Sequence, residues 1–279
     1  MQSPAQTSSL AGVKHVIAVA SGKGGVGKST TTVNLALALA AEGARVGVLD
    51  ADIYGPSQGM MLGIKSGTRP EPVGENGMRP IDVLGLQAMS ISLLIDDTTP
   101  MVWRGPMASG ALQQLITQTQ WDNLDYLMID MPPGTGDIQL TLSQKVAVDG
   151  AVIVTTPQDI ALLDAKRGIE MFRKVGIPVL GVVENMSTHI CSQCGHEEHI
   201  FGEGGGERIS RDYETQLLGA LPLSLRIREE ADSGLPTVAA DPQGEISSIY
   251  RGIAQQLMDK LAAADDSARK GPLISIVED

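Results

Sequence analysis

One short segment carries the clearest chemistry in this chain. Residues 22–29 read Gly-Lys-Gly-Gly-Val-Gly-Lys-Ser and match the pattern Gly-x-x-x-x-Gly-Lys-[Ser/Thr]. Glycines let such a loop wrap so that its backbone N–H groups face phosphate oxygens, and the following helix N-terminus adds positive potential. Lys28 is expected to reach the β- and γ-phosphates, and the Ser29 hydroxyl to ligate Mg²⁺. The expected nucleotide contacts are Gly22, Lys23, Gly24, Gly25, Val26, Gly27, Lys28, Ser29 and Thr30.

Three aspartates follow apolar runs and could complete that site. Asp50 and Asp52 end one predicted strand, and Asp130 ends another. In a parallel sheet such strand ends face the crevice where ligands bind. Asp130 is therefore predicted to hold a magnesium-bound water, and Asp52 to orient the attacking water. A helix N-cap or a solvated loop position is the alternative for any one of them. The Gly-containing segment 132–137 is predicted to sense the γ-phosphate.

A Cys-x-x-Cys pair, Cys191 and Cys194, contains the only cysteines of the chain. Two thiolates are half of a closed four-ligand site. One interpretation is a site shared by two chains, holding [4Fe–4S] or zinc. Another is zinc within one chain, completed by His189, His196 or His199. A thioredoxin-like redox pair and two ordinary thiols are the remaining alternatives, and the spacing alone does not choose iron over zinc.

Alternating strand and helix patterns must position these residues. The patterns predict an α/β fold whose mostly parallel central sheet carries helices on both faces. Segment 187–206, which holds both cysteines, is predicted to be an irregular loop. Predicted strands are 15–21, 44–52, 126–130, 149–157, 177–185 and 218–222, with short strand-like pieces in 81–95. Predicted helices are 28–42, 105–119, 159–175 and 244–264, with a short one at 57–62.

Composition and charge narrow the class of protein. Hydrophobic residues make up 42% of the 279 residues and aromatic ones 3%, which indicates a globular core built from aliphatic side chains. The net charge of −12 argues against non-specific nucleic-acid binding. Neither a membrane span nor a secretory signal is recognisable, so a cytoplasmic protein is expected. The expected organisation is a flexible lead-in at 1–12, one ATPase domain at 13–264 and a C-terminal tail at 265–279.

Several motifs together resemble a known family. SGKGGVGKST (21–30) is similar to the deviant Walker A loop of MinD/ParA-type ATPases. In combination, the motifs of residues 13–262 resemble the Mrp/ApbC branch of iron–sulfur cluster carriers. These motifs are LDADIYGPS (49–57), MVWRGPM (101–107), IDMPPGTGD (129–137), TTPQDIALLDAKRG (155–168), ENMS (184–187), Cys-x-x-Cys and IFGEGGG (200–206).

The resemblance implies a role for individual residues of the nucleotide site. Lys23 would be the signature lysine, which reaches the nucleotide of the other subunit in a homodimer that sandwiches ATP. Asp52 and Asp130 would be the aspartates of switch I and switch II. Asn185 would read the adenine edge, with Pro222 lining the base pocket.

The resemblance also implies a cargo and partners. Cys191 and Cys194 would bind a labile [4Fe–4S] cluster across the dimer interface, received from an assembly scaffold and passed to apo-proteins with ATP binding or hydrolysis linked to transfer. Many bacterial members carry a small N-terminal domain, whereas only about 13 residues precede the first predicted strand here. A short family form or a truncated chain would account for this.

A different class of function stays open at this point. MinD/ParA relatives also act as ATP-dependent positioning or regulatory switches on membrane or DNA, and here the Cys-x-x-Cys could hold a structural zinc. The C-terminal segment 265–279 carries more acidic than basic residues, unlike a basic membrane anchor. We therefore expect neither membrane nor nucleic acid among the partners.

Overall fold

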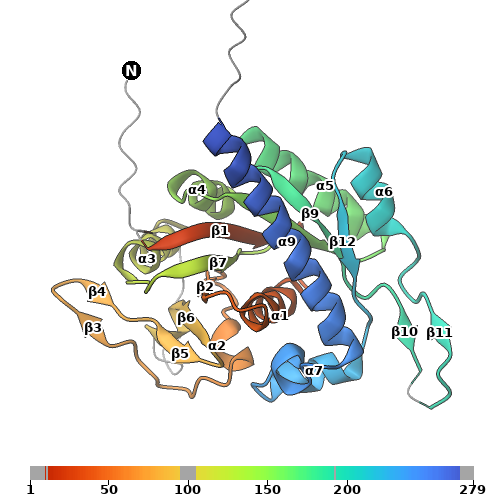
Figure 1. The fold of residues 1–279 in the computed structure, drawn as a ribbon, viewed down its shortest axis with the longest axis horizontal. Helices are drawn as coiled ribbons and strands as arrows, with labels where there is room; N and C mark the ends of the chain where they lie inside the picture. Colours follow the sequence, from red (N-terminus) through yellow and green to blue (C-terminus); the bar gives the residue numbers. More distant parts are fainter. Residues whose placement is uncertain (1–9, 11, 95–104, 192, 271–279) are drawn as a thin grey trace, which may run out of the picture.

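Within the described part of the chain, eight strands form the central sheet, which lies in the middle of the molecule (Figure 1). They are β1 (Val13–Ala20), β2 (Val46–Asp50), β5 (Ile81–Val83), β6 (Leu86–Ser90), β7 (Leu124–Asp130), β8 (Gly150–Thr155), β9 (Val179–Glu184) and β12 (Leu217–Ala220). The computed structural model describes residues 10, 12–94, 105–191 and 193–270. The spatial order is β12-β9-β8-β1-β7-β2-β6-β5, and each neighbouring pair is parallel except β5 with β6. The predicted mostly parallel α/β sheet is confirmed.

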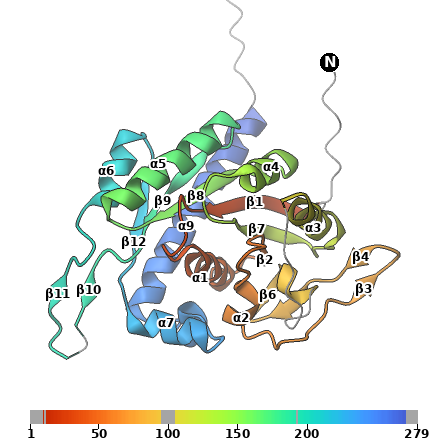
Figure 2. The ribbon, with the colours of Figure 1, turned by 180° about the vertical axis from the view of Figure 1, so that it is seen from behind.

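Helices cover both faces of the sheet (Figures 1 and 2). They are α1 (Lys28–Ala41), α2 (Gln58–Met61), α3 (Gly105–Gln118), α4 (Asp137–Lys145), α5 (Asp159–Lys174), α6 (Gly205–Asp212), α7 (Leu225–Asp232), α8 (Thr237–Ala240) and α9 (Glu245–Lys270), with a 3-10 turn at Ile91–Leu93. Buried side chains of α1, α8 and α9 form one core, and those of α3, α4, α5 and α6 form the other. Strand β1 contributes side chains to both cores. Ile17 and Val19 pack in the core with α1, whereas Val16 and Ala18 pack in the core with α5. This explains why the strand reads as a continuous apolar run.

The register of the central strands brings the predicted nucleotide residues to one edge. Asp50 at the end of β2 lies opposite Asp130 at the end of β7. Val19, near the end of β1, also lies opposite Asp130. The loop that leaves β1 toward α1 therefore emerges beside both carboxylates, as parallel pairing requires.

The segment that holds the cysteines is not the irregular loop predicted for 187–206. It forms an antiparallel hairpin of β10 (His189–Ile190) and β11 (Glu197–Glu198), and its last residues begin α6. The Cys191 N–H donates to the His196 carbonyl at 2.9 Å, and the Gly195 N–H donates to the Cys191 carbonyl at 2.8 Å. These bonds close the turn, in which Gly195 has a φ of 71°, a left-handed conformation that glycine adopts readily. A second small hairpin pairs β3 (Pro72–Val73) with β4 (Gly77–Met78).

The closing helix extends beyond its predicted end at residue 264. Helix α9 continues to Lys270, so the predicted tail at 265–279 begins as helix. Asp265 explains part of this, because its carboxylate lies 3.5 Å from Nε2 of buried His15 and 3.8 Å from Nζ of Lys14. Residues 271–279 lie outside the described residues. Within the described part of the chain, no helix is both long and apolar enough to cross a membrane.

Candidate functional site

The glycine-rich loop has the backbone conformation that phosphate binding needs. Gly25 and Gly27 have φ of 80° and 82°, in the left-handed region that favours glycine. No backbone N–H from Gly22 to Gly27 donates a hydrogen bond to another described residue. A Cβ added at Gly27 would lie 2.1 Å from Nδ2 of Asn185, so no larger residue fits there without movement. Free N–H groups at the start of a helix suit an anion, and the loop therefore fits a nucleotide phosphate.

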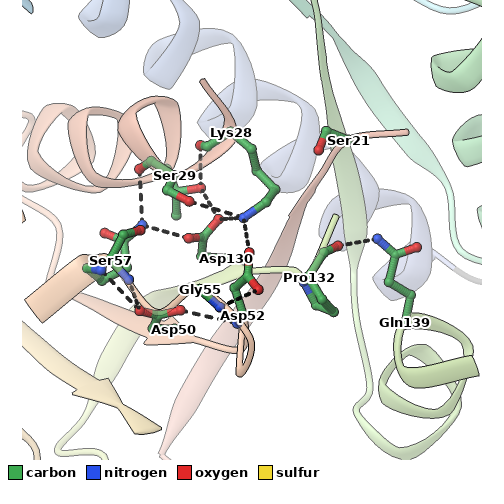
Figure 3. Close-up of polar contacts among 12 residues, drawn as sticks. Ser21, Lys28, Ser29, Asp50, Asp52, Gly55, Ser57, Asp130, Pro132 and Gln139 are labelled. Carbon is green, nitrogen blue, oxygen red and sulfur yellow. Dashed lines mark hydrogen bonds and ion pairs between the residues drawn. The ribbon is translucent and has the colours of Figure 1, made fainter. Parts of the chain in front are cut away.

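Lys28 lies at the centre of a buried charge cluster (Figure 3). Its Nζ donates to Oδ1 of Asp130 at 2.5 Å and to Oγ of Ser29 at 3.1 Å, and it lies 3.7 Å from Oδ2 of Asp52. The Asp130 side chain is fully buried and that of Lys28 is 6% exposed. The two carboxylates thus supply the counter-charge for this ammonium.

The three residues predicted to hold Mg²⁺ lie together around this lysine. Ser29 and Asp130 both bond Nζ of Lys28, and the Asp52 carboxylate faces the same nitrogen. Burial raises the pKa of Asp52, while the positive charge of Lys28 opposes the rise. Hydroxyl and carboxylate oxygens are the ligands that Mg²⁺ prefers, so the donor set fits this ion.

Asp50 is a structural anchor rather than an open ligand. Its Oδ2 accepts from the backbone N–H of Ser57 at 2.9 Å, the N–H of Gln58 at 3.0 Å and the hydroxyl of Ser90 at 3.1 Å. Burial, together with the nearby charge of Asp130, raises the pKa of Asp50 to about 7. These bonds hold the segment after β2 so that Asp52 lies beside the phosphate loop.

Gln58 is a site residue that the sequence reasoning missed. Its Nε2 donates to Oδ2 of Asp130 at 2.9 Å and to the carbonyl of Ser29 at 3.0 Å. It therefore joins the segment after β2, the end of β7 and the phosphate loop. A glutamine at the start of a short helix is no chemical signal by itself. Its position after the LDADIYGPS motif is the one clue that could have found it.

Two other predicted nucleotide contacts stand outside the charge cluster. Lys23 is half-buried and its side chain forms no ion pair with a described residue. Its carbonyl accepts from the hydroxyl of Ser21 at 2.9 Å, which shapes the loop. Thr30 is half-buried, and its carbonyl accepts from Nδ2 of Asn34. The Lys23 side chain is thus available for a group that this chain alone does not supply.

Asn185 contacts the phosphate loop directly. Its Nδ2 donates to the carbonyl of Val26 at 2.9 Å, and its N–H donates to the carbonyl of Thr155 at 2.7 Å. Pro222, the other predicted base contact, follows Leu221, whose carbonyl accepts from the N–H of Ser187 at 2.9 Å. The two predicted base contacts therefore come from adjacent strand ends, β9 and β12.

The cysteines lie at the end of the β10–β11 hairpin, apart from the phosphate loop (Figure 1). Cys191 is half-buried and Cys194 is exposed, and both thiols are free. Hydrogen bonds from the backbone N–H groups of Gln193 and Cys194, and one from the Cys194 side chain, lower the pKa of the Cys191 thiol. A lowered pKa and exposure are the properties of a thiolate that binds or exchanges a metal.

The histidines of this segment do not complete a site with the cysteines. His199 bonds the carbonyl of Ser187 through Nδ1 at 2.9 Å, and it lies 3.9 Å from Glu203. Among the described residues, no three His, Cys, Asp or Glu side chains come together as a metal site. Within one chain the two thiols remain half of a four-ligand set.

Comparison with known proteins shows to which family this chain belongs. A family model described as ParA: NUBPL iron-transfer P-loop NTPase matches residues 12–258. The iron-sulfur cluster carrier protein of Pseudomonas fragi is 67% identical over 250 residues, covering 90% of this chain and 87% of that protein. The carrier protein of Escherichia coli K12 is 62% identical over 252 residues, covering 90% and 67%. Mouse iron-sulfur cluster transfer protein NUBPL is 49% identical over 259 residues, covering 92% and 81%.

Solved structures show the same fold. A nucleotide-binding protein of Archaeoglobus fulgidus in complex with ADP is 37% identical, with a TM-score of 0.70 over 81% of this chain and 88% of that one. The cell division ATPase MinD of Pyrococcus furiosus shares the fold, with a TM-score of 0.65 at 22% identity over 88% and 99%. The relatives named as carriers favour the carrier class over the positioning switch. The chain belongs to the ParA/NUBPL family of iron-transfer P-loop NTPases.

Proposed function

We propose that this chain is an ATP-binding and hydrolysing carrier that receives a [4Fe–4S] cluster and transfers it to apo-proteins. The observation that carries the proposal is the separation of two sites within one chain. A phosphate loop with buried counter-charges lies at the strand ends, and an exposed half-site of two thiols lies on a hairpin. The relatives named as carriers at 62–67% identity support the same function.

The cluster is the cargo, and two copies of the chain would hold it. Cys191 and Cys194 supply two thiolates, and a [4Fe–4S] cluster needs four. A homodimer that brings the two hairpins together would complete the set. The unpaired Lys23 would reach the nucleotide of the partner subunit in the same dimer, which would join nucleotide binding to dimer formation.

In the nucleotide site, each residue has a proposed role. Lys28 would bind the β- and γ-phosphates and so exchange part of its contact with Asp130 for the nucleotide. Ser29, Asp52 and Asp130 would hold Mg²⁺ directly or through water, and the ion would neutralise phosphate charge. Asp52 would orient the attacking water. Asn185 and Pro222 would contact the base.

A short hydrogen-bonded path would link the two sites. It begins where Nδ2 of Asn185 donates to the Val26 carbonyl in the phosphate loop. Two residues later the Ser187 N–H donates to the Leu221 carbonyl, and the Leu223 N–H donates to the Thr188 carbonyl at 2.7 Å. His189 then starts the hairpin that carries Cys191. A movement of the phosphate loop would thereby change the position of the hairpin, which is a coupling between distinct sites.

The decisive experiment measures iron, sulfide and zinc after anaerobic reconstitution. We expect four irons and four sulfides per two chains, as the cluster formula requires, and their loss in the Cys191→Ala/Cys194→Ala double variant. One zinc per two chains and no iron uptake would contradict the carrier function. The path is tested separately with Asn185→Ala, at an ATP concentration that nucleotide titration shows to saturate the variant. That variant should keep its cluster but lose the effect of bound ATP on the rate at which a chelator removes iron.

A further inference from the structure

A groove lies beside the cysteine hairpin and is not part of the nucleotide site. It has a volume of about 540 Å³ and is bounded by β10, by the segment between β12 and α7, and by the first turns of α9. Its apolar wall consists of Ile190, Leu223, Leu225, Ile246 and Ile249. Leu225 is 64% exposed and Ile190 is 51% exposed, so the two side chains present apolar surface to solvent in the groove wall.

The polar part of the groove is predominantly acidic. Glu197, Glu229 and Glu245 line it, and Arg226 is the one Lys or Arg among the described residues that do so. The Arg226 guanidinium is already engaged, with Oε1 of Glu230 at 2.6 Å and Oδ2 of Asp241 at 3.0 Å.

Two of the lining acids lack a cation. Glu229 lies 3.3 Å from Arg228, but Glu197 and Glu245 form no ion pair with any described residue. The groove thus combines exposed aliphatic side chains with carboxylates that no described Lys or Arg side chain pairs.

The groove adjoins the β10–β11 hairpin, which carries the two cysteines. His189 and Leu223 form a parallel bridge, and the Leu223 N–H donates to the Thr188 carbonyl. Ile190, in the groove wall, directly precedes Cys191. No residue of the phosphate loop lines the groove, and Pro222 is its one lining residue with a proposed nucleotide contact. A molecule bound here would therefore lie next to the cluster ligands without contacting phosphate.

We propose that this groove docks a segment of the protein that accepts the cluster, and that this segment presents aliphatic side chains flanked by lysine or arginine. Aliphatic anchors would bury Leu225 and Ile190, and the flanking cations would face Glu197 and Glu245. Docking at this place brings an acceptor's empty ligands close to Cys191. The inference rests on the proposed carrier function, and it adds the location and chemistry of acceptor recognition.

The chain's own segment 271–279 is a poor occupant of this groove. It contains the aliphatic run Leu-Ile-Ser-Ile-Val, but Glu278 and Asp279 directly follow that run, and the acidic groove would repel them.

The test uses two synthetic peptides with the full chain. Both carry a Leu-Ile-Leu core, flanked by lysines in one and by glutamates in the other, and binding is measured by fluorescence anisotropy. We expect the lysine-flanked peptide to bind at least tenfold more tightly. Leu225→Asp and, separately, Glu245→Lys should each weaken it at least fivefold. The control Leu235→Asp, at a leucine that is 42% exposed and outside the groove, should leave the affinity unchanged.

Three results would overturn the proposal. One is equal affinity for both peptides, or an affinity that neither groove variant changes. Another is a loss of ATP affinity in both Leu225→Asp and Glu245→Lys, which would assign the groove to the nucleotide. The last is a loss of dimer in Leu225→Asp, which would make a second copy of the chain the occupant. Iron and sulfide contents of the same samples report the carrier function independently, because peptide binding requires no cluster.

Discussion

The phosphate-loop edge and the cysteine hairpin differ in how firmly the structure holds their functional groups. At the first, Lys28, Asp130 and Gln58 are buried and bonded to one another across three segments. At the second, Cys194 is exposed and the two strands pair over only two residues each. Buried, mutually bonded groups are pre-organised for phosphate chemistry. Exposed thiols on a short hairpin suit a cargo that must arrive and leave.

The largest expected effect comes from removing the charge at the centre of the buried cluster. Lys28→Ala should lower ATP hydrolysis by about 100-fold or more, because the phosphates lose their preorganised cation. It should also lower the free energy of unfolding of the nucleotide-free protein by about 3 kcal/mol, since the Asp130 carboxylate stays buried without its counter-charge. A phosphate-release assay and urea unfolding measure the two effects.

Lys23→Ala is the matched control from the same loop. Lys23 forms no ion pair with a described residue, so its loss should change the free energy of unfolding by less than about 0.5 kcal/mol. Hydrolysis should still fall, because we propose that Lys23 reaches the partner's nucleotide. An equal loss of stability in both variants would mean that the cluster around Lys28 contributes no particular stability.

The second prediction concerns the hairpin. Cys191→Ser should abolish cluster binding yet leave ATP affinity and the urea midpoint unchanged, because the thiol is only half-buried and has no partner in the core. Iron analysis and nucleotide titration of one preparation measure both. A large loss of stability would show that the fold depends on the hairpin as much as on the buried cluster around Lys28, and that the two regions do not differ in this respect.

A smaller effect is expected at Gln58, which the buried cluster uses as a bridge. Gln58→Ala removes the bonds to Asp130 and to the Ser29 carbonyl, and should cost about 1–2 kcal/mol of unfolding free energy. We also expect hydrolysis to fall by about tenfold, equivalent to about 1.4 kcal/mol in the barrier. Gln255→Ala, at an exposed glutamine on α9 bonded to Asp259, should change neither quantity.

The smallest effect on stability is expected at the exposed ion pair of Arg45 and Asp125. Its size can be compared with that of the buried pair of Lys28 and Asp130. Arg45 bonds the Asp125 carboxylate at 3.0 Å and 3.1 Å and thereby lowers the pKa of Asp125. Because the pKa of Asp125 is lower in the folded protein than in the unfolded chain, the pair stabilises the folded protein at pH values above the ordinary pKa of a carboxyl group. This contribution is lost as the pH falls through the pKa that Asp125 has in the folded protein.

Arg45→Ala should therefore be slightly less stable than the parent at neutral pH and equal to it in strong acid. Thermal unfolding as a function of pH measures the difference. Added salt should also reduce it. A difference that persists in acid would assign the effect to lost packing of the arginine stem.

Much of the fold and of the nucleotide site follows from local sequence. The buried strands that end at Asp50 and Asp130 are continuous apolar runs, and the helix after the phosphate loop ends before Gly43. Gly25 and Gly27 adopt the positive φ that a phosphate loop needs. Each signal lies within a few neighbouring residues, which is why it can be recognised without the fold.

The hairpin, the course of α9 and Gln58 could not be predicted in this way. The strands of the hairpin are two residues long, too short for an alternating pattern. Helix α9 continues past residue 264 because Asp265 meets His15 and Lys14, which are distant in sequence. Gln58 bonds Asp130, 72 residues away.

The amino-acid sequence by itself determined the phosphate loop, the acidic strand ends, the cysteine pair and the family to which they point. Only the tertiary structure decided that Asp50 is an anchor and Gln58 a bridge, and that an acidic, aliphatic groove adjoins Cys191. The physical reason is the separation along the sequence over which each effect acts. Motifs and helix caps depend on neighbouring residues. The burial of a side chain, its pKa and the shape of a groove depend on which distant segments the sheet brings together.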